Sequence, residues 1–267
     1  APGKRGICGV RENIDGRLYF LAYNRVIAEN VDPIEKKPFF NFLPGSYSLS
    51  IATLGCNFRC DNCQNWDISQ GAKDSKLARK QIENSGFYLS AERLVQDALD
   101  EDTPSISYTY TEPTIFLEYA LDAMKLAKTK GLKNLWVSNG YMSKESLNLI
   151  LPYLDAINID IKSMDADFYQ ANCGAKIDPI LEHCKKIVAS GIWLEATTLI
   201  IPQLSDDEKM LKKLAEFIKN ELGATVPWHV TSFSGAISWK LKNLPDTSIQ
   251  TLKKAYQIGK EAGLKYV

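Results

Sequence analysis

Short runs of apolar or alternating apolar and polar residues recur along the chain from residue 48 onward, and longer amphipathic stretches separate them. The short runs predict β-strands at 48–54, 106–110, 135–138, 156–161, 193–201 and 228–233. The longer stretches predict helices at 114–130, 144–154, 180–190, 205–223 and 248–261. Repeated β–α units of this kind indicate a parallel sheet with right-handed crossovers.

Local residues mark where several of these helices begin and end. Pro113 lies at the start of the first, and Gly191 and Gly263 follow the ends of two others. Ser205, with Glu208 three residues later, predicts a capping box at the start of the helix that Gly223 ends. These boundaries favour about six β–α units.

Six such units predict an α/β fold, a partial (βα)6 TIM-like barrel formed by residues 45–267. Residues 1–44 are expected to form a short N-terminal extension, with a strand at 17–23 followed by an irregular stretch containing Pro33, Pro38 and Pro44. Barrels of this kind carry their active sites at the carboxyl ends of the strands. The chemically distinctive residues of this chain follow those strand ends.

The composition argues against nucleic-acid-binding and membrane-spanning proteins. The chain has 267 residues, 45% hydrophobic and 24% charged, with 32 basic and 32 acidic residues. This balance lacks the basic excess of nucleic-acid-binding proteins, so a nucleic acid is not expected as a partner. No apolar run reaches the roughly 20 residues of a membrane span, and the first residues lack the apolar core of a secretory signal. We therefore expect a cytoplasmic protein without a membrane partner.

Cysteines supply the strongest chemical signal. Cys56, Cys60 and Cys63 form a C-x3-C-x2-C motif directly after the first predicted barrel strand. Three thiolates on one short loop can converge on a single inorganic centre, and iron–sulfur clusters favour closely spaced cysteines. Three protein ligands also leave one position open for a cofactor or substrate, as in catalytic metal sites. The motif therefore favours an iron–sulfur cluster.

A structural zinc site is the alternative, and it would make the protein a zinc-stabilised binding module. Zinc would need a fourth ligand, for which Cys8, His183 and His229 are candidates. The C-x3-C-x2-C spacing differs from the paired C-x2-C units of zinc knuckles. Cys173 and Cys184 are unclustered, and we interpret them as buried or incidental thiols.

The cysteine motif resembles that of the radical S-adenosylmethionine (SAM) superfamily. In that family three cysteines bind a [4Fe–4S] cluster, and SAM chelates the fourth iron; one-electron reduction then yields a 5′-deoxyadenosyl radical that abstracts hydrogen from the substrate. The resemblance implies a radical SAM oxidoreductase with Cys56, Cys60 and Cys63 as metal ligands. Family members usually have an aromatic residue near the adenine directly before the third cysteine. Asn62 stands there in this chain, where Phe58 and Trp66 are the aromatic candidates.

Other strand ends extend the resemblance. Glu112-Pro113 matches part of the Gly-Gly-Glu-Pro segment that holds the SAM amino group, although a proline-initiated helix also explains it. The segment 137–141 resembles Thr-Asn-Gly-Phe, and 227–229 resembles Pro-Tyr-His, of the glycyl radical enzyme activases; a simple Asn-Gly turn is the alternative for the former. The SAM-binding residues that the resemblance implies are Asn65, Thr111, Glu112, Ser138, Asn139, Asp160, Lys162 and His229.

Asp160 and Lys162 are expected on one face of the fourth predicted barrel strand, because side chains alternate along a strand. Two charges in a barrel mouth are costly unless they are paired or bound to a ligand. Lys162 suits the SAM carboxylate, and Asp160 suits ribose hydroxyls or a cation. The alternative is an internal ion pair without a direct role in binding.

Within the superfamily, residues 45–267 resemble pyruvate formate-lyase activating enzyme and, more closely, the AmmeMemoRadiSam-system radical SAM proteins. The stretches that carry this resemblance are 6–13, 63–66, 108–114 and 226–229. The activase resemblance implies that the protein abstracts a glycine Cα hydrogen from a glycyl radical enzyme or similar protein, with flavodoxin or ferredoxin as electron donor. An AmmeMemoRadiSam-type enzyme with a different substrate remains the alternative.

Overall fold

A seven-stranded sheet forms the centre of the molecule in the computed structural model, which describes residues 1–74 and 77–267. The strand order is β11-β10-β9-β8-β7-β5-β4. Six strands run parallel, and β4 pairs antiparallel with β5 at one edge. The bounds are β4 Ala28–Pro33, β5 Tyr47–Ala52, β7 Ser105–Tyr108, β8 Lys133–Ser138, β9 Ala156–Asp160, β10 Trp193–Ile200 and β11 Trp228–Ser232.

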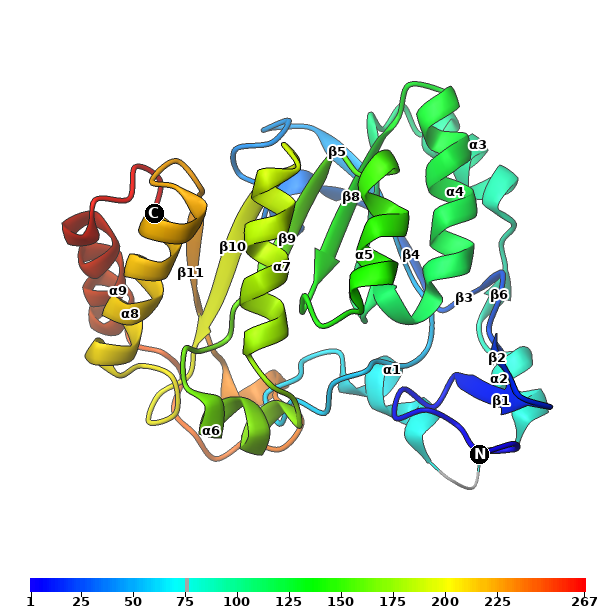
Figure 1. Ribbon diagram of the computed structural model, residues 1–267, viewed down its shortest axis with the longest axis horizontal. Helices are drawn as coiled ribbons and strands as arrows, with labels where there is room; N and C mark the ends of the chain where they lie inside the picture. Colours follow the sequence, from blue (N-terminus) through cyan, green and yellow to red (C-terminus); the bar gives the residue numbers. More distant parts are fainter. Residues whose placement is uncertain (75–76) are drawn as a thin grey trace.

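Helices alternate with the parallel strands, and α4, α5 and α7 lie side by side across one face of the sheet (Figure 1). The longer helices are α3 Ala91–Asp100, α4 Leu117–Thr129, α5 Lys144–Ile150, α7 Asp178–Ala189, α8 Glu208–Phe217 and α9 Ile249–Ala262. The shorter ones are α1 Trp66–Gln70, α2 Arg79–Glu83 and α6 Ala166–Phe168. The predicted partial (βα)6 barrel is confirmed. No helix within the described residues has both the length and the apolar character to cross a membrane.

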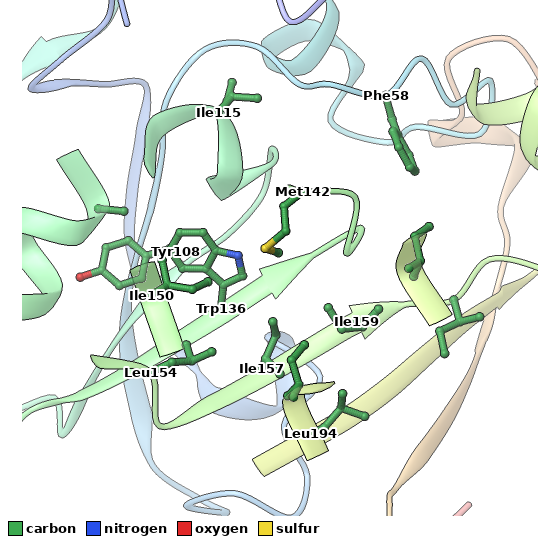
Figure 2. Close-up of a cluster of buried hydrophobic side chains, with 14 of the residues drawn as sticks. Phe58, Tyr108, Ile115, Trp136, Met142, Ile150, Leu154, Ile157, Ile159 and Leu194 are labelled. Carbon is green, nitrogen blue, oxygen red and sulfur yellow. The ribbon is translucent and has the colours of Figure 1, made fainter. Parts of the chain in front are cut away.

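The main core lies between the sheet and these helices. Trp136 and Ile157 on neighbouring strands meet Ile150 and Leu154 from the segment between them, and all four side chains are buried (Figure 2). Parallel strands covered by helices are buried on both faces, and every residue of β7 is accordingly buried. This packing fixes the strand ends on which the site is built.

The helix predicted at 205–223 begins later than its sequence suggests. Asp207 is the N-cap, and its carboxylate accepts a 2.9 Å hydrogen bond from the Met210 amide. The Ser205 hydroxyl instead accepts from the Ile201 amide at 2.9 Å, at the end of β10. The predicted Ser205–Glu208 capping box is therefore wrong, because the Ser205 hydroxyl is already engaged and the carboxylate two residues later caps the helix.

The N-terminal residues contribute more regular structure than expected. β1 (Arg11–Ile14) and β2 (Arg17–Phe20) form a hairpin around Asp15 and Gly16, which both have positive φ. The stretch predicted to be irregular contains β4, and Pro33 is its last residue, at an edge where proline is tolerated. Two further short strands, β3 (Arg25–Val26) and β6 (Phe87–Tyr88), pair antiparallel.

Candidate active site

A cavity of about 720 Å³ opens at the carboxyl ends of the parallel strands. It lies where ligands bind in barrels of this class. Ten of the eleven predicted site residues line it: Cys56, Cys60, Cys63, Asn65, Thr111, Glu112, Ser138, Asn139, Asp160 and Lys162. The structure therefore brings residues from the cysteine loop and the ends of β7, β8 and β9 to one place.

The cysteine loop, residues 55–65, leaves β5 through a tight turn at Gly55. Gly55 has φ +99°, and a Cβ atom there would lie 2.6 Å from the Cys8 carbonyl oxygen. Both the backbone conformation and the close approach require glycine. The Gly55 amide also donates to the Ile68 carbonyl at 2.8 Å, which returns the chain toward α1.

Two distant segments hold the far side of the cysteine loop. The amides of Arg59 and Asp61 donate to the carbonyls of Cys173 and Asn172, both at 3.0 Å. On the other flank, the Trp239 amide donates to the Cys63 carbonyl at 3.1 Å. In Figure 1 the loop accordingly runs between α6 and the segment that follows β11. The loop is thus fixed by contacts that the sequence does not reveal.

Cys60 is buried, Cys56 and Cys63 are partly buried, and the last two already receive polar contacts at sulfur. Burial raises the pKa of Cys56, and the Phe58 amide donates to its sulfur at 3.4 Å. Burial likewise raises the pKa of Cys63, whose sulfur lies 3.3 Å from the Ser69 hydroxyl. Metal binding replaces the thiol protons, and donors aimed at the sulfurs stabilise the resulting thiolates. This set of donors fits an iron–sulfur cluster.

Two of the three candidates for a fourth zinc ligand, the two histidines, are engaged elsewhere. His183 Nδ1 lies 3.0 Å from the Gly140 carbonyl oxygen, and His229 Nε2 lies 2.6 Å from Glu195 Oε2. Across residues 1–74 and 77–267, no three side chains of His, Cys, Asp or Glu are arranged to hold one metal ion. A tetrahedral zinc ion would need its thiolates about 3.8 Å apart, whereas a cluster holds them farther apart. The zinc alternative therefore has no ready-made ligand set in this part of the chain.

Glu112 ties the ends of β7 and β8 together. Its side chain is 1% exposed, and Oε1 accepts from the Thr114 amide and hydroxyl and from the Ser138 hydroxyl, at 3.1, 2.6 and 2.8 Å. Oε2 accepts from the Asn139 amide at 2.9 Å. Burial raises the pKa of Glu112, and these four hydrogen bonds act in the opposite direction. The carboxylate thus fixes the backbone that faces the cavity.

Asp160 and Lys162 form an ion pair on the cavity wall. Lys162 Nζ lies 2.9 Å from Asp160 Oδ2, as alternation at the end of β9 predicts. Burial alone would lower the pKa of Lys162, but Asp160 and the thiols of Cys60 and Cys173 raise it well above its ordinary value. Lys162 therefore remains a cation, available to an anionic group in the cavity.

A comparison with known families decides the class of protein. The sequence profile of the radical SAM superfamily matches residues 50–218, more than half of the chain. The chain belongs to the radical SAM superfamily. It is therefore an enzyme whose cofactors are a [4Fe–4S] cluster and SAM.

Individual relatives agree with this assignment. An uncharacterized protein of Methanocaldococcus jannaschii is 43% identical over 265 residues, covering 99% of this chain and 76% of that protein. The pyruvate formate-lyase-activating enzyme of Clostridium pasteurianum is 24% identical over 224 residues, 78% of this chain and 87% of the relative.

Solved structures share the fold. A domain of the Bacteroides vulgatus pyruvate-formate lyase-activating enzyme has a TM-score of 0.50 at 20% identity, covering 60% of this chain and 96% of that one. SuiB of Streptococcus suis bound to SAM has a TM-score of 0.58 at 12% identity, covering 78% of this chain and 45% of that one. At these identities the likeness concerns the fold alone.

Two of the predicted SAM-site residues hold the cavity wall by contacts to the backbone. Asn65 Nδ2 donates to the Tyr110 carbonyl at 2.7 Å, and Thr111 Oγ1 donates to the Thr53 carbonyl at 3.0 Å. These contacts join the cysteine loop, the end of β5 and the end of β7. Both residues also line the cavity. They therefore stabilise its wall and present polar atoms at its surface.

His229 is the one predicted site residue that the structure does not bring to the cavity. It is the second residue of β11 and lies two positions before Thr231, which lines the cavity on the same face of the strand. Its imidazole bonds to the fully buried Glu195, and the Phe40 ring lies 5.1 Å away. The contact of His229 with the nucleoside therefore stays a prediction.

The aromatic candidates for the adenine differ in position. Phe58 lines the cavity, and its ring lies 5.4 Å from that of Tyr141, among the core side chains (Figure 2). Trp66 is 40% exposed and is not part of the cavity wall. Asn62, directly before the third cysteine, accepts a 2.8 Å hydrogen bond from Asn172. Of the two aromatic candidates, Phe58 is therefore the one that lines the cavity.

Sequence reasoning missed a charged cluster on the β4 side of the cavity. Asp32 Oδ2 accepts from Lys37 Nζ and from the Tyr110 hydroxyl, both at 2.6 Å. Lys37 is 2% exposed, and its Nζ lies 4.0 Å from the Tyr110 ring centroid. Tyr110 has φ +62°, a conformation that favours the glycine usual at this point of the family motif. The replacement of that glycine by Tyr110 was the one signal in the sequence that pointed to this cluster. The contacts of Asp32 with Tyr110 join residues far apart in the chain, so the sequence does not reveal them.

Replacing Asp32 by Ala should lower the free energy of unfolding by about 3 kcal/mol, because the buried Lys37 amine loses its anionic partner. Lys36→Ala is the matched control: its amine contacts the same carboxylate at 3.2 Å but is 68% exposed, so its loss should cost less than about 1 kcal/mol. Urea unfolding measures both variants. Equal losses of unfolding free energy in the two variants would contradict the conclusion that Asp32 mainly compensates the buried Lys37 amine.

The same ion pair should give an acid-dependent stability. Although burial acts to raise the pKa of Asp32, the bonds from Lys37 and Tyr110 dominate and lower it from 3.8 to about 2. A carboxyl group whose pKa is lower in the folded than in the unfolded protein stabilises the fold. This stabilisation is fully present at pH values above the unfolded-state pKa, and it is lost as the pH falls through the folded-state pKa. Urea unfolding at pH values between 4 and 2 should therefore show a smaller difference between wild type and Asp32→Ala as the pH falls.

Proposed function

We propose that the protein is a radical SAM enzyme that abstracts a hydrogen atom from a glycyl radical enzyme or a similar protein substrate. The observation that carries the chemistry is the convergence of three thiols from one loop with the polar ends of three parallel strands on a single cavity. When bound, the reduced cluster and SAM supply the electron and the 5′-deoxyadenosyl radical; the protein positions and shields them.

The chain's own residues have distinct tasks in this proposal. Cys56, Cys60 and Cys63 would hold three irons and leave the fourth open to SAM. Lys162 offers a cation to the SAM carboxylate, and Asp160 holds that amine in place. Glu112 fixes the neighbouring backbone, which limits the reorganisation that binding requires.

The activase assignment rests on relatives and on the architecture. Relatives include the (2S)-3-sulfopropanediol dehydratase activating enzyme of Klebsiella oxytoca, 28% identical over 115 residues, as well as the clostridial activating enzyme. The strands β4 and β11 are the two edges of an open sheet, so the barrel is not closed between them. An open barrel suits a protein segment as substrate, and flavodoxin or ferredoxin would supply the electron.

The substrate class can be tested with candidate glycyl radical enzymes encoded by the same organism. Each candidate is incubated anaerobically with the reduced protein and SAM, and radical formation is followed by electron paramagnetic resonance (EPR). We expect a glycyl radical on one of them, with 5′-deoxyadenosine formed in matching amount. SAM cleavage without a glycyl radical on any candidate would contradict the activase assignment and leave the radical SAM chemistry standing.

Lys162→Ala should weaken SAM binding roughly 10- to 150-fold, because losing a charge-assisted contact costs about 1.5–3 kcal/mol. Iron content should stay at the wild-type level, since Lys162 does not bind iron in this proposal. Lys133→Ala is the matched control, because Lys133 pairs with Asp155 at 2.9 Å at the opposite end of the sheet. Calorimetric titration with SAM measures the effect. Wild-type affinity in Lys162→Ala would make the Asp160–Lys162 pair purely structural.

A further inference from the structure

Part of the cavity wall is formed by charged residues of β4 and of the turn that follows it. Asp32, Lys36 and Lys37 all line the cavity, in addition to the residues at the ends of β7, β8 and β9. Thr231 and Ser232 of β11 line it as well. Because β4 and β11 are the two edges of the open sheet, both edges contribute to the cavity wall. A substrate segment that enters between these edges would pass the charged residues.

This part of the wall carries one more positive than negative charge. Asp32 accepts from Lys37 Nζ through Oδ2 at 2.6 Å and from Lys36 Nζ through Oδ1 at 3.2 Å. One carboxylate therefore faces two ammonium groups, and each ammonium group has three N–H donors. Two further acids on the cavity wall have partners of their own, since Glu112 accepts from the Asn139 amide and Asp160 pairs with a different lysine. The surplus positive charge beside β4 can thus pair with an anion from outside.

The same wall contains a strained residue and a buried charge. Tyr110 has φ +62°, yet its hydroxyl donates to Asp32 at 2.6 Å and its carbonyl accepts from Asn65 at 2.7 Å, so both ends are held. Lys37 is 2% exposed; burial lowers its pKa, and Asp32 opposes that shift. Strained backbone and buried charges in a cavity are more frequent at functional sites than elsewhere. Both features indicate that this wall binds a ligand.

The turn that carries the two lysines continues into a segment anchored on neighbouring strands. The amides of Phe40 and Asn41 donate to the fully buried Glu195 carboxylate at 3.1 and 3.0 Å. Asn158 Nδ2 donates to the Pro38 carbonyl at 2.9 Å. These contacts join the segment to β9 and β10, so the fold sets the position of the lysines. A binding wall fixed in this way loses little conformational freedom when a ligand arrives.

We propose that Lys36 and Lys37 form a substrate subsite for the carboxylate of an acidic side chain, which lies near the reacting glycine in a protein segment. The proposal rests on the proposed function and adds a substrate preference to it. A carboxylate beside two ammonium groups gains charge-assisted hydrogen bonds, whereas a lysine side chain there would meet like charges. Asp32 keeps the two amines beside each other.

The test uses short fluorescein-labelled peptides, each with one central glycine and one glutamate at a different flanking position. Two matched sets carry glutamine or lysine in place of the glutamate. Fluorescence anisotropy at low ionic strength measures their binding to the reconstituted protein with SAM, for wild type, Lys36→Glu, Lys36→Met and Lys212→Glu. Lys212 on α8 is the matched control, because it is 53% exposed against 68% for Lys36, also pairs with an acid, and does not line the cavity. Circular dichroism checks the fold of each variant.

We expect a position at which wild type binds the glutamate peptide about fivefold more tightly than the glutamine peptide. Lys36→Met should lose this preference, and Lys36→Glu should bind the lysine peptide best, because the wall then carries one net negative charge. Lys212→Glu should match wild type. Absence of a glutamate preference at every position in wild type, whether or not the peptides bind, would overturn the proposal. An unchanged preference in the two Lys36 variants would overturn it as well.

The proposed function has a separate readout in the same experiment. The central glycine carries deuterium on its Cα, and hydrogen abstraction transfers one deuterium into 5′-deoxyadenosine, which mass spectrometry detects. A glutamate preference that depends on Lys36, without deuterium transfer from any peptide, would contradict abstraction from glycine and leave the anion subsite standing. Deuterium transfer without the preference would support the proposed function and overturn the subsite.

Discussion

Alanine at Cys56, Cys60 or Cys63 is expected to abolish cluster binding and SAM cleavage together. The three thiols line one cavity, and each would hold one iron of the cluster. Removing one leaves two protein ligands, too few to keep a cluster in place against chelation and oxidation. Iron and sulfide analysis with visible absorption measures the first loss, and chromatography of SAM products measures the second.

Cys184→Ala is the control for this series, since it removes a buried thiol from α7 and should keep both cluster and activity. Circular dichroism separates loss of the cluster from loss of the fold. Full iron content and activity in any one of the three loop variants would exclude that cysteine as an essential ligand.

Glu112→Ala is expected to have the second largest effect. Four donors from Thr114, Ser138 and Asn139 would lose their acceptor inside the protein. Buried donors left unsatisfied cost about 1–3 kcal/mol each before relaxation, so a net loss of about 3 kcal/mol or more in unfolding free energy is reasonable. Because Ser138 and Asn139 also line the cavity, SAM affinity should fall at least about tenfold.

Urea unfolding and calorimetric SAM titration measure these two effects separately. Glu145→Ala, which removes a carboxylate near the exposed start of α5, serves as the control and should leave SAM binding at the wild-type level. A Glu112→Ala protein with wild-type stability and affinity would show that the carboxylate does not organise the strand ends.

Local patterns account for the features that the sequence predicted correctly. Alternation at the end of β9 placed Asp160 and Lys162 on one face, and they form the expected ion pair. The cysteine spacing placed three thiols on one loop after β5, and that loop lies at the cavity. In each case the decisive information lies within a few residues.

The features that escaped prediction depend on distant segments or on competition between neighbours. One such feature is the cluster of Asp32, Lys37 and Tyr110. It forms only because β4 pairs with β5, and no local sequence pattern predicted that pairing. The bond between His229 and the buried Glu195 depends on the pairing of β11 with β10. The backbone of Asn172 and Cys173 reaches the cysteine loop only through the tertiary fold.

SAM cleavage by the reduced wild-type protein is the most direct test of the central claim. Anaerobically reconstituted protein is reduced with dithionite and incubated with SAM, beside Cys60→Ala treated identically. We expect 5′-deoxyadenosine and methionine in equal amounts from wild type and none from the variant. An intact, reduced cluster that yields no 5′-deoxyadenosine above the enzyme-free control would contradict it.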